Sequence, residues 1–240
     1  MNWMTIESQI RVVGILAILF ALYSLWMGQM KARDLPAGYT NPVLALELAA
    51  NGAEINAINS SEGGKASAFI KNQLSKDFGY IVIYVVLFSC VALLLTEVTS
   101  DWGKYLGWGA VACAVLAGVF DLIENLGMLK AVSTPAGAAS DSLANSIRYP
   151  SLAKWALLFV FCLLVGLTLS RLSGSLLIPG FAFLIAAVLG LSGVTLNLLR
   201  PKAYWMFSAA IVLWGLATLY IAITFTLWPQ RVLNNFFADS

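Results

Sequence analysis

Long apolar stretches separated by short polar ones divide the chain into segments that are long enough to cross a membrane. A spanning helix needs about 20 mostly apolar residues. We expect such helices at about residues 10–27, 78–96, 103–128, 152–170, 176–198 and 204–228. The pattern therefore predicts an all-α fold: a polytopic membrane helix bundle of about six transmembrane helices, forming a single integral membrane domain over residues 1–240.

The first long connection, residues 28–77, carries helical signals of its own. Asn41-Pro42 is a capping residue followed by proline at a first helical position, which predicts a short helix over about 43–50. This helix is too short to span, and we expect it to lie at the membrane interface. A further helical piece, about 66–77, is expected to lead directly into the second span.

The second long connection, residues 129–151, is rich in Ala, Ser and Gly around Pro135 and predicts a flexible loop. With six spans, both long connections lie on one side of the membrane. That side also carries most of the Lys and Arg residues, so the positive-inside rule places the N- and C-termini outside. The remaining loops are short, which makes the helices that they join antiparallel neighbours.

Composition supports a membrane protein and removes several classes of function. Charged residues make up 11% of the chain, less than half of the roughly 25% typical of soluble domains. No basic block indicates nucleic acid as a partner. The chain has no histidine, which excludes Ser–His and Cys–His catalysis and most zinc and haem sites. We expect no metal site and no cofactor.

Two further patterns have a structural interpretation. Gly190-Leu191-Ser192-Gly193 matches the G-x-S-G of rhomboid proteases, but those enzymes need a histidine base, so we interpret these as helix-packing residues. Seven of the eight tryptophans fall near the ends of the predicted spans, as in an interfacial aromatic belt. Only Trp214 lies in the interior of a span.

The third span is the one with unusual polar content. Its uncharged run, Tyr105–Phe120, reaches roughly 24 Å at 1.5 Å per residue, short of the hydrocarbon core of about 30 Å. The helix must therefore continue through Asp121 and on to Asn125, which places Asp121 and Glu124 at or just beneath one membrane face. Ionisable groups inside a membrane are costly and indicate a functional site by default.

A stripe of small residues on the same helix predicts which way Asp121 points. Ala110, Ala114, Gly118, Asp121 and Asn125 are spaced by four, four, three and four residues, so they share one helix face. Small residues on such a face let a neighbouring helix approach closely. Asp121 is therefore expected to face protein. Lys154 begins the following antiparallel helix at similar depth and is the natural counter-ion.

Other polar residues fall on the same side of the membrane. Asp77 begins the second span, and Tyr80 and Tyr84 follow it on one face. For Glu47, in the short interfacial helix, we prefer the interpretation that it lies at a solvated edge of the helix. The functional alternative is that this helix closes over the pocket. No catalytic residue is identified. The candidate ligand- or proton-binding residues are Asp121, Glu124, Asn125, Asp77, Lys154, Tyr80, Tyr84 and Glu47. An ion pair that only fixes helix packing is an equally weighted alternative.

Four short elements resemble those of a family of uncharacterised bacterial multi-pass membrane proteins. They are Leu44-x-Leu46-Glu47-Leu48-Ala49, Asp77-Phe78-x-Tyr80-x3-Tyr84, Phe120-Asp121-x-x-Glu124-Asn125 and Ala153-Lys154-Trp155. The resemblance covers about residues 43–170 and leaves out the last two helices. It implies no known activity. It implies that these elements belong together, and for such a protein we expect the bacterial cytoplasmic (inner) membrane.

Three functions remain open, in order of preference. The first is a ligand-binding or complex-forming membrane protein, whose pocket holds a lipid headgroup, quinone or small amphiphile. Its partners would be membrane lipids, and protein subunits or a second copy docked through small-residue helix faces. The second is a proton-coupled transporter, for which carboxylates beside a lysine are common, although the polar residues stop at one face. The third, which we favour least, is a membrane-embedded lipid-modifying enzyme using carboxylate acid–base chemistry.

Overall fold

A computed structural model describes residues 5–36, 39–99, 102–172, 174–199 and 204–237, and these contain helices and no strand. Six helices within these ranges are long and apolar enough to cross a membrane. They are α1 (Ile6–Met27), α4 (Lys65–Val98), α5 (Trp102–Val132), α6 (Asp141–Leu169), α7 (Leu177–Leu199) and α8 (Tyr204–Leu227). The all-α membrane bundle predicted from the sequence is confirmed.

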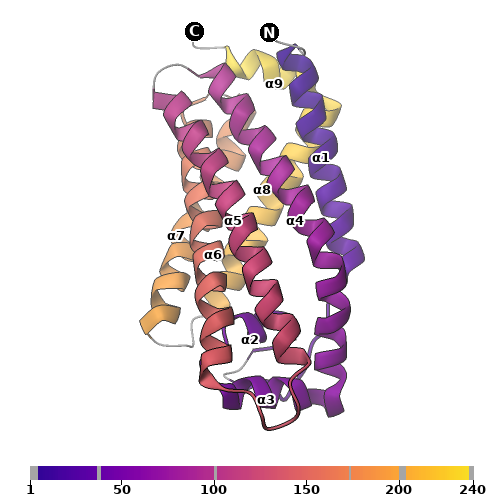
Figure 1. The fold of residues 1–240 in the computed structure, drawn as a ribbon. Helices are drawn as coiled ribbons and strands as arrows, with labels where there is room; N and C mark the ends of the chain where they lie inside the picture. The colour runs from indigo at the N-terminus through magenta and orange to yellow at the C-terminus, as the bar shows by residue number, and fades with distance from the viewer. Residues whose placement is uncertain (1–4, 37–38, 100–101, 173, 200–203, 238–240) are drawn as a thin grey trace.

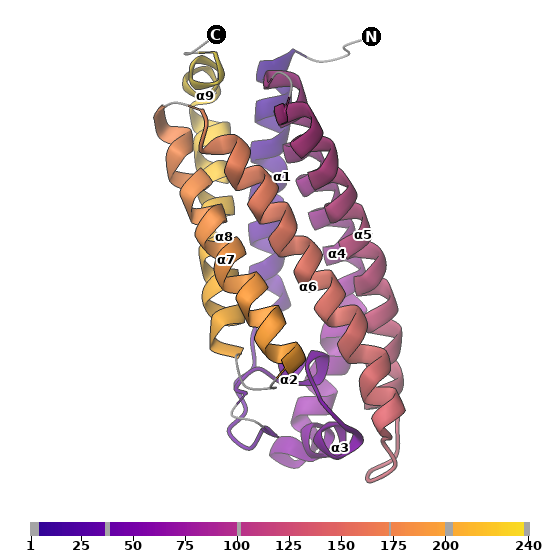
Figure 2. The same cartoon turned by 90° about the vertical axis from the view of Figure 1, so that its left-hand side faces the viewer.

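The six long helices form a closed ring. Consecutive helices from α4 to α8 pack side by side, and α1 packs against both α4 and α8 to complete the ring. The two ends of the chain lie at the same end of the bundle (Figure 1). The short helices α2 (Pro42–Glu47) and α3 (Gly52–Ser60) lie at the opposite end, as Figure 2 also shows.

Three of the long helices extend well beyond the thickness of a hydrocarbon core. At 1.5 Å per residue, α4, α5 and α6 are about 44–51 Å long, against roughly 30 Å for the core. The extra length lies at the end where α2 and α3 are found, and it encloses them. The helices therefore form both the spanning bundle and the walls around the first long connection.

The prediction of a flexible loop over residues 129–151 is wrong for most of that range. Helix α5 continues to Val132 and α6 begins at Asp141, so only residues 133–140 connect them. Ser140 caps α6 by accepting a hydrogen bond from the backbone N–H of Leu143. Packing explains the rest: both helices bury apolar side chains here, namely Met128, Ala131, Leu143, Ala144 and Ile147.

The first long connection is also largely helical. Asn41 caps α2 through its side chain, as predicted, and Glu62, Gly63 and Gly64 adopt positive φ angles where α4 is about to begin. Helix α4 then runs without interruption from Lys65 into the span, as predicted. The expected position of the short helix at the membrane interface stays a prediction. Helix α2 is packed among α3, α4, α5 and α6, and most of its side chains are buried.

A short helix near the end of the described chain, α9 (Pro229–Phe236), was not expected from the sequence. It packs against α1 and α8 with Val232 and Phe236 buried. The proline in its first turn and the apolar residues Val232, Leu233 and Phe236 at helical spacing are the signals that could have indicated it.

Small residues set the distances between the long helices. A Cβ atom added to Gly107 would lie 2.4 Å from the Thr96 side chain, and one added to Gly118 would lie 2.6 Å from Val85, so α4 and α5 are in close contact. At Gly190 of α7 an added Cβ would lie 2.3 Å from the ring of Phe159. The predicted packing roles of Gly118 and Gly190 are therefore confirmed within one copy of the chain, and Gly107 has a similar role.

Candidate functional site

Five charged side chains meet inside the bundle, between two separate apolar cores. We call them the acidic cluster; its members are Glu47, Asp77, Asp121, Glu124 and Lys154. On each of α4, α5 and α6, the cluster residue separates side chains of the core at the α2–α3 end from side chains of the core near the termini. Measured from the helix ends near α2 and α3, the cluster residues of these helices lie roughly 12–20 Å inside.

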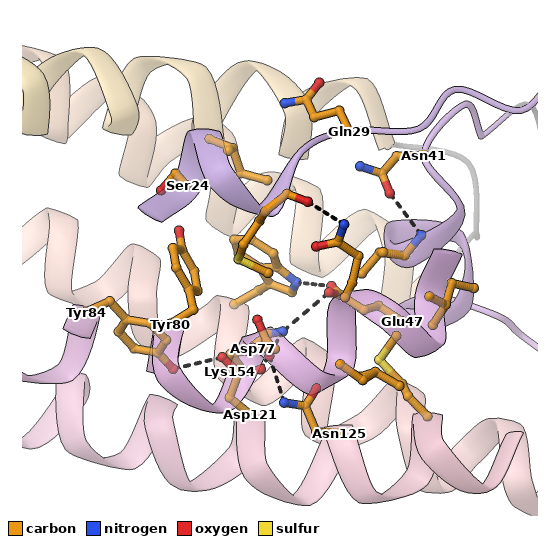
Figure 3. Close-up of a pocket in the computed structure, with 18 of the residues that line it drawn as sticks. Ser24, Gln29, Asn41, Glu47, Asp77, Tyr80, Tyr84, Asp121, Asn125 and Lys154 are labelled. Carbon is orange, nitrogen blue, oxygen red and sulfur yellow. Dashed lines mark hydrogen bonds and ion pairs between the residues drawn. The ribbon is translucent and has the colours of Figure 1, made fainter. Parts of the chain in front are cut away.

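Lys154 is the centre of the acidic cluster. Its Nζ lies 3.1 Å from Asp121 Oδ1, 2.8 Å from Glu124 Oε2 and 3.5 Å from Glu47 Oε1. Figure 3 shows Lys154 among Asp121, Glu47 and Asp77. Lys154 is only 5% exposed. A buried ammonium group is tolerated because opposite charges and hydrogen-bond acceptors replace the lost water.

Neutral donors hold three of the carboxylates in place. The hydroxyl of Tyr84 donates to Asp121 Oδ2 at 2.9 Å, and Asn125 Nδ2 donates to Asp77 Oδ2 at 2.7 Å. Glu47 Oε2 accepts from the indole N–H of Trp155 at 2.8 Å. Hydrogen bonds to an ionised group are stronger than neutral ones, so these donors fix the geometry of the site.

The charges of the acidic cluster do not balance. Four carboxylates share one lysine, which gives a formal charge of −3 when all five groups are ionised. Within the described part of the chain, Lys154 is the only Lys or Arg whose nitrogen lies within 4.0 Å of any of these carboxylates. Asp77 has no such cation at all. Protons or a bound cation would reduce this excess of negative charge.

A cavity of about 380 Å³ lies against the acidic cluster. Helices α1, α4 and α8 supply aromatic walls, and Trp155 adds a ring from α6. In Figure 3, Tyr80 and Tyr84 lie toward one end of the cavity and Asn41 and Glu47 toward the other. The aromatic and polar lining residues include Phe20, Phe69, Tyr80, Tyr84, Trp155, Trp214, Ser24, Gln29, Asn41, Gln73 and Asn125.

The structure brings the eight candidate residues together. Seven of them line the cavity. The eighth, Glu124, contacts Lys154 but does not line the cavity. The predicted pair of Asp121 and Lys154 is present, and Asp121 faces protein as expected. The preferred solvated position of Glu47 is wrong: it is 7% exposed. Its burial is compensated because both Lys154 and the Trp155 N–H contact its carboxylate.

Aromatic residues are the part of the site that sequence reasoning missed. Trp155 was interpreted as an interfacial residue, and Phe20 was not considered. Phe20 stacks on Tyr80 with ring centroids 5.2 Å apart, and Trp214 lies 6.3 Å from Phe20. The one available signal was the interior position of Trp214 in its span.

Within the described residues, no group of three or more His, Cys, Asp or Glu side chains is arranged to hold a metal ion. The reason is visible at the centre of the cluster, where the Lys154 ammonium lies in the space between the carboxylates. Neutral hydrogen-bond donors contact the outer carboxylate oxygens. The arrangement can bind charge, exchange protons and orient a ligand beside apolar rings.

Comparison with known proteins adds no further relationship: no family model, no curated protein and no solved structure matches the chain. The resemblance of the four short elements to a bacterial membrane protein family therefore stays a prediction. Six apolar helices identify the chain as an integral membrane protein, and its function has to be argued from the site.

Proposed function

We propose that this integral membrane protein binds a lipid or another small amphiphile in the cavity beside the acidic cluster. The observation that carries the proposal is the combination of a volume of about 380 Å³ with aromatic walls and charged groups at one side. Ligand sites are commonly cavities of about 300–1,000 Å³ with mostly apolar walls and a few placed polar groups. An amphiphile has the same division into apolar and polar parts.

Access to the cavity is consistent with an amphiphile arriving from the membrane or its surface. Gly28 and Gln29, which follow α1, and Gly215 of α8 line the cavity and are exposed on the surface of the bundle. Helices α1 and α8 are neighbours in the ring. A ligand entering here would place its polar group toward Asp77 and its apolar part along apolar lining residues such as Leu158 and Ile211.

Filling the cavity tests the proposal. A Cβ atom added to Gly215 meets no atom within 4 Å, so the side chain of Gly215→Phe can begin at the cavity wall without a collision at its Cβ. Leu219→Phe, an exposed position on the same helix, is the matched control. We expect native mass spectrometry of protein released from lipid nanodiscs to show a retained amphiphile with wild type and Leu219→Phe, and loss of it with Gly215→Phe. Equal retention by all three proteins would contradict the proposal.

We also propose that the protein lies in a bacterial inner membrane with both termini outside. The support is the excess of Lys and Arg on the side of the two long connections, together with the shared location of the termini at the other end of the bundle (Figure 1). A protease-cleavable tag on the C-terminus tests this. Cleavage in intact spheroplasts is expected, and protection until the membrane is opened would reverse the orientation.

Proton-coupled transport is the second candidate, and the charge imbalance of the acidic cluster favours it, because protons are one way to supply the missing positive charge. The path beyond the cluster argues against it. Toward the termini, the described interior has no buried charged side chain and is mostly apolar, with Leu87, Phe88, Val91, Ala114 and Phe161 buried in one core. Proton-driven flux in proteoliposomes that disappears in Asp121→Asn would favour transport over binding alone.

A further inference from the structure

If the cavity binds an amphiphile, as proposed above, its lining also indicates the chemical class of the polar group of that ligand. We infer that the ligand carries an ammonium group, on a lipid headgroup or on a free amphiphilic amine, and that this group binds between Asp77 and the aromatic wall of the cavity. Three independent features of the cavity support a cationic ligand over a neutral or an anionic one.

The first feature is the position of the unbalanced charge. Lys154 Nζ has carboxylate oxygens of Asp121, Glu124 and Glu47 within 3.5 Å, so its charge is already paired within the chain and offers little to a phosphate or carboxylate ligand. Asp77 differs from these three carboxylates. It is half-buried, it lines the cavity, its hydrogen bond comes from the neutral Asn125 amide, and no described Lys or Arg lies within 4.0 Å of it. A cation in the cavity would supply the counter-charge that the chain lacks.

The second feature is the arrangement of rings beside Asp77. The rings of Phe20, Tyr80 and Tyr84 form a continuous series with centroid separations of 5.2 Å and 5.8 Å, and all three line the cavity. Several aromatic faces around one space are the usual means of binding alkylated ammonium groups through cation–π contacts. The site already contains one such contact, with Lys154 Nζ 5.2 Å from the centroid of a Trp155 ring.

The third feature is a donor that has no acceptor. Trp214 lines the cavity and is 6% exposed, and its indole N–H has no hydrogen-bond partner among the described residues. A buried donor left unpaired is costly. A ligand oxygen a short distance from the ammonium group, such as the ester or phosphate oxygen of an amino lipid, would satisfy it. The ligand would then combine a cation for Asp77 with an acceptor for Trp214.

A pair of amphiphiles that differ in one atom tests the inference on the intact protein. Dodecanoylcholine carries a trimethylammonium group and an ester oxygen, and its uncharged neohexyl ester has carbon in place of the ammonium nitrogen. We expect the choline ester to bind wild-type protein at least about tenfold more tightly, as judged by titration with native mass spectrometry and by the rise in unfolding temperature. Asp77→Asn is expected to remove most of this preference.

Two other variants complete the design. Glu97→Gln removes a carboxylate that is exposed near the opposite end of α4, where it bonds to Gln9, so the preference for the choline ester should be unchanged. Trp214→Phe keeps a ring and removes the N–H, so both esters should bind about three- to tenfold more weakly. Nanodiscs with and without phosphatidylethanolamine distinguish a lipid headgroup from a free amine as the source of the ammonium group. A lipid ligand would co-purify with wild-type protein from nanodiscs that contain phosphatidylethanolamine and would be lost in Asp77→Asn. A free amine would bind equally in both kinds of nanodisc.

Each remaining outcome overturns a different statement. Equal binding of the two esters, with loss of both in Gly215→Phe, would disprove a cationic ligand and leave amphiphile binding in place. A preference for the choline ester that survives in Asp77→Asn would disprove the position assigned to the ammonium group. Absence of binding by either ester and by lipids would overturn the proposed function itself.

Discussion

Helices α4, α5 and α6 hold together in two different ways along their length. Toward the termini, the contact is apolar and close, because Gly107 and Gly118 of α5 allow direct packing on α4. Toward the α2–α3 end, the same helices are joined by the acidic cluster, and the contact is completed by Glu47 from a separate segment of the chain. The half of the bundle near the termini is held by apolar packing at these glycines. The half near α2 and α3 depends on the charged groups of the acidic cluster, which contact one another.

The difference matters because the two kinds of contact fail differently. Packing of small residues is local, so a change at one glycine displaces one neighbour. A buried ionic cluster is coupled, since removing one charge changes the environment of all the others. We therefore expect large and unequal effects in the acidic cluster, and smaller and more uniform effects in the apolar half.

Lys154→Met should give the largest effect. It leaves Asp121, Glu124 and Glu47 without their shared cation in a buried site, and breaking such a contact typically costs about 3–5 kcal/mol. Unfolding of the purified protein in detergent, followed by circular dichroism, measures the loss. Lys104→Met, an exposed lysine at the start of α5, is the control and should be close to wild type. Similar stability of the two variants would show that the acidic cluster is already neutralised by protons.

Trp155→Phe should have the next largest effect, on the docking of α2. It removes the hydrogen bond from the indole N–H to Glu47, and such bonds to charged groups are worth about 1.5–3 kcal/mol. We expect faster proteolysis within residues 28–64, because α2 is held at the bundle by this contact and by Lys154. Trp102→Phe changes an exposed indole near the opposite end and should leave the rate unchanged. Unaltered proteolysis in Trp155→Phe would mean that apolar contacts alone hold α2.

Gly107→Ala tests the apolar half. The new Cβ would lie 2.4 Å from Thr96 Cγ2 and 2.9 Å from the Ala92 carbonyl oxygen, so α4 and α5 must separate, at a cost of about 1–3 kcal/mol. Gly215→Ala is a matched control in another spanning helix, where the added atom meets nothing within 4 Å. It should be neutral or stabilising by up to about 1 kcal/mol. Thermal unfolding of the two variants side by side gives the answer, and equal values would refute close packing at Gly107.

Glu124→Gln should have a small effect, in contrast to Lys154→Met. It removes one of the excess negative charges, and the Gln carbonyl oxygen still accepts from Lys154, so stability should stay within about 1 kcal/mol of wild type. Comparing the stability of Glu124→Gln with that of Lys154→Met distinguishes the effect of the excess negative charge from the effect of losing a contact. A loss for Glu124→Gln as large as that for Lys154→Met would indicate a balanced cluster.

The smallest expected effect is a pH dependence outside the spans, at the turn before α4. The Ser61 hydroxyl and the Glu62 backbone N–H both donate to Asp34 and hold the pKa of its carboxyl below the ordinary value. Because the folded-state pKa is lowered, this contact stabilises the turn above the unfolded-state pKa and is lost as pH falls through the folded-state value. The protection of the amides of residues 61–64 against hydrogen exchange, measured relative to the intrinsic exchange rate at each pH, should fall as the pH is lowered into the acid range. Ser61→Ala should reduce that dependence; an identical profile would assign it to other groups.

The parts of the site that lie on regular helices could be predicted from the sequence. The stripe from Ala110 to Asn125 could be predicted because small residues and Asp121 repeat at helical spacing on one face, and Lys154 was found because it enters the next helix at matching depth. The place of Glu47 could not be predicted in the same way. Its contacts with Lys154 and Trp155 join segments about a hundred residues apart, and leucines on both sides gave no preferred face.

The flexible loop expected over residues 129–151 shows a different limit. Its Ser and Gly residues, Pro135 and Pro150 disfavour a helix on local grounds, although its alanines favour one. The helices extend because Met128, Ala131 and Ile147 are buried against the segment containing α2 and α3. A local pattern cannot report a surface that exists only after distant parts of the chain have come together.

The position of Lys154, the one lysine of the acidic cluster, along the sequence has a consequence for biosynthesis. All four acidic members of the cluster are translated before Lys154, which follows Glu124 by 30 residues. At about 5–20 residues per second, the nascent protein spends roughly 2–6 s with these acids made and their cation still unmade. A polypeptide that stops within that interval carries all four acids and lacks the lysine that contacts three of them, so truncation there would leave the cluster without its internal cation.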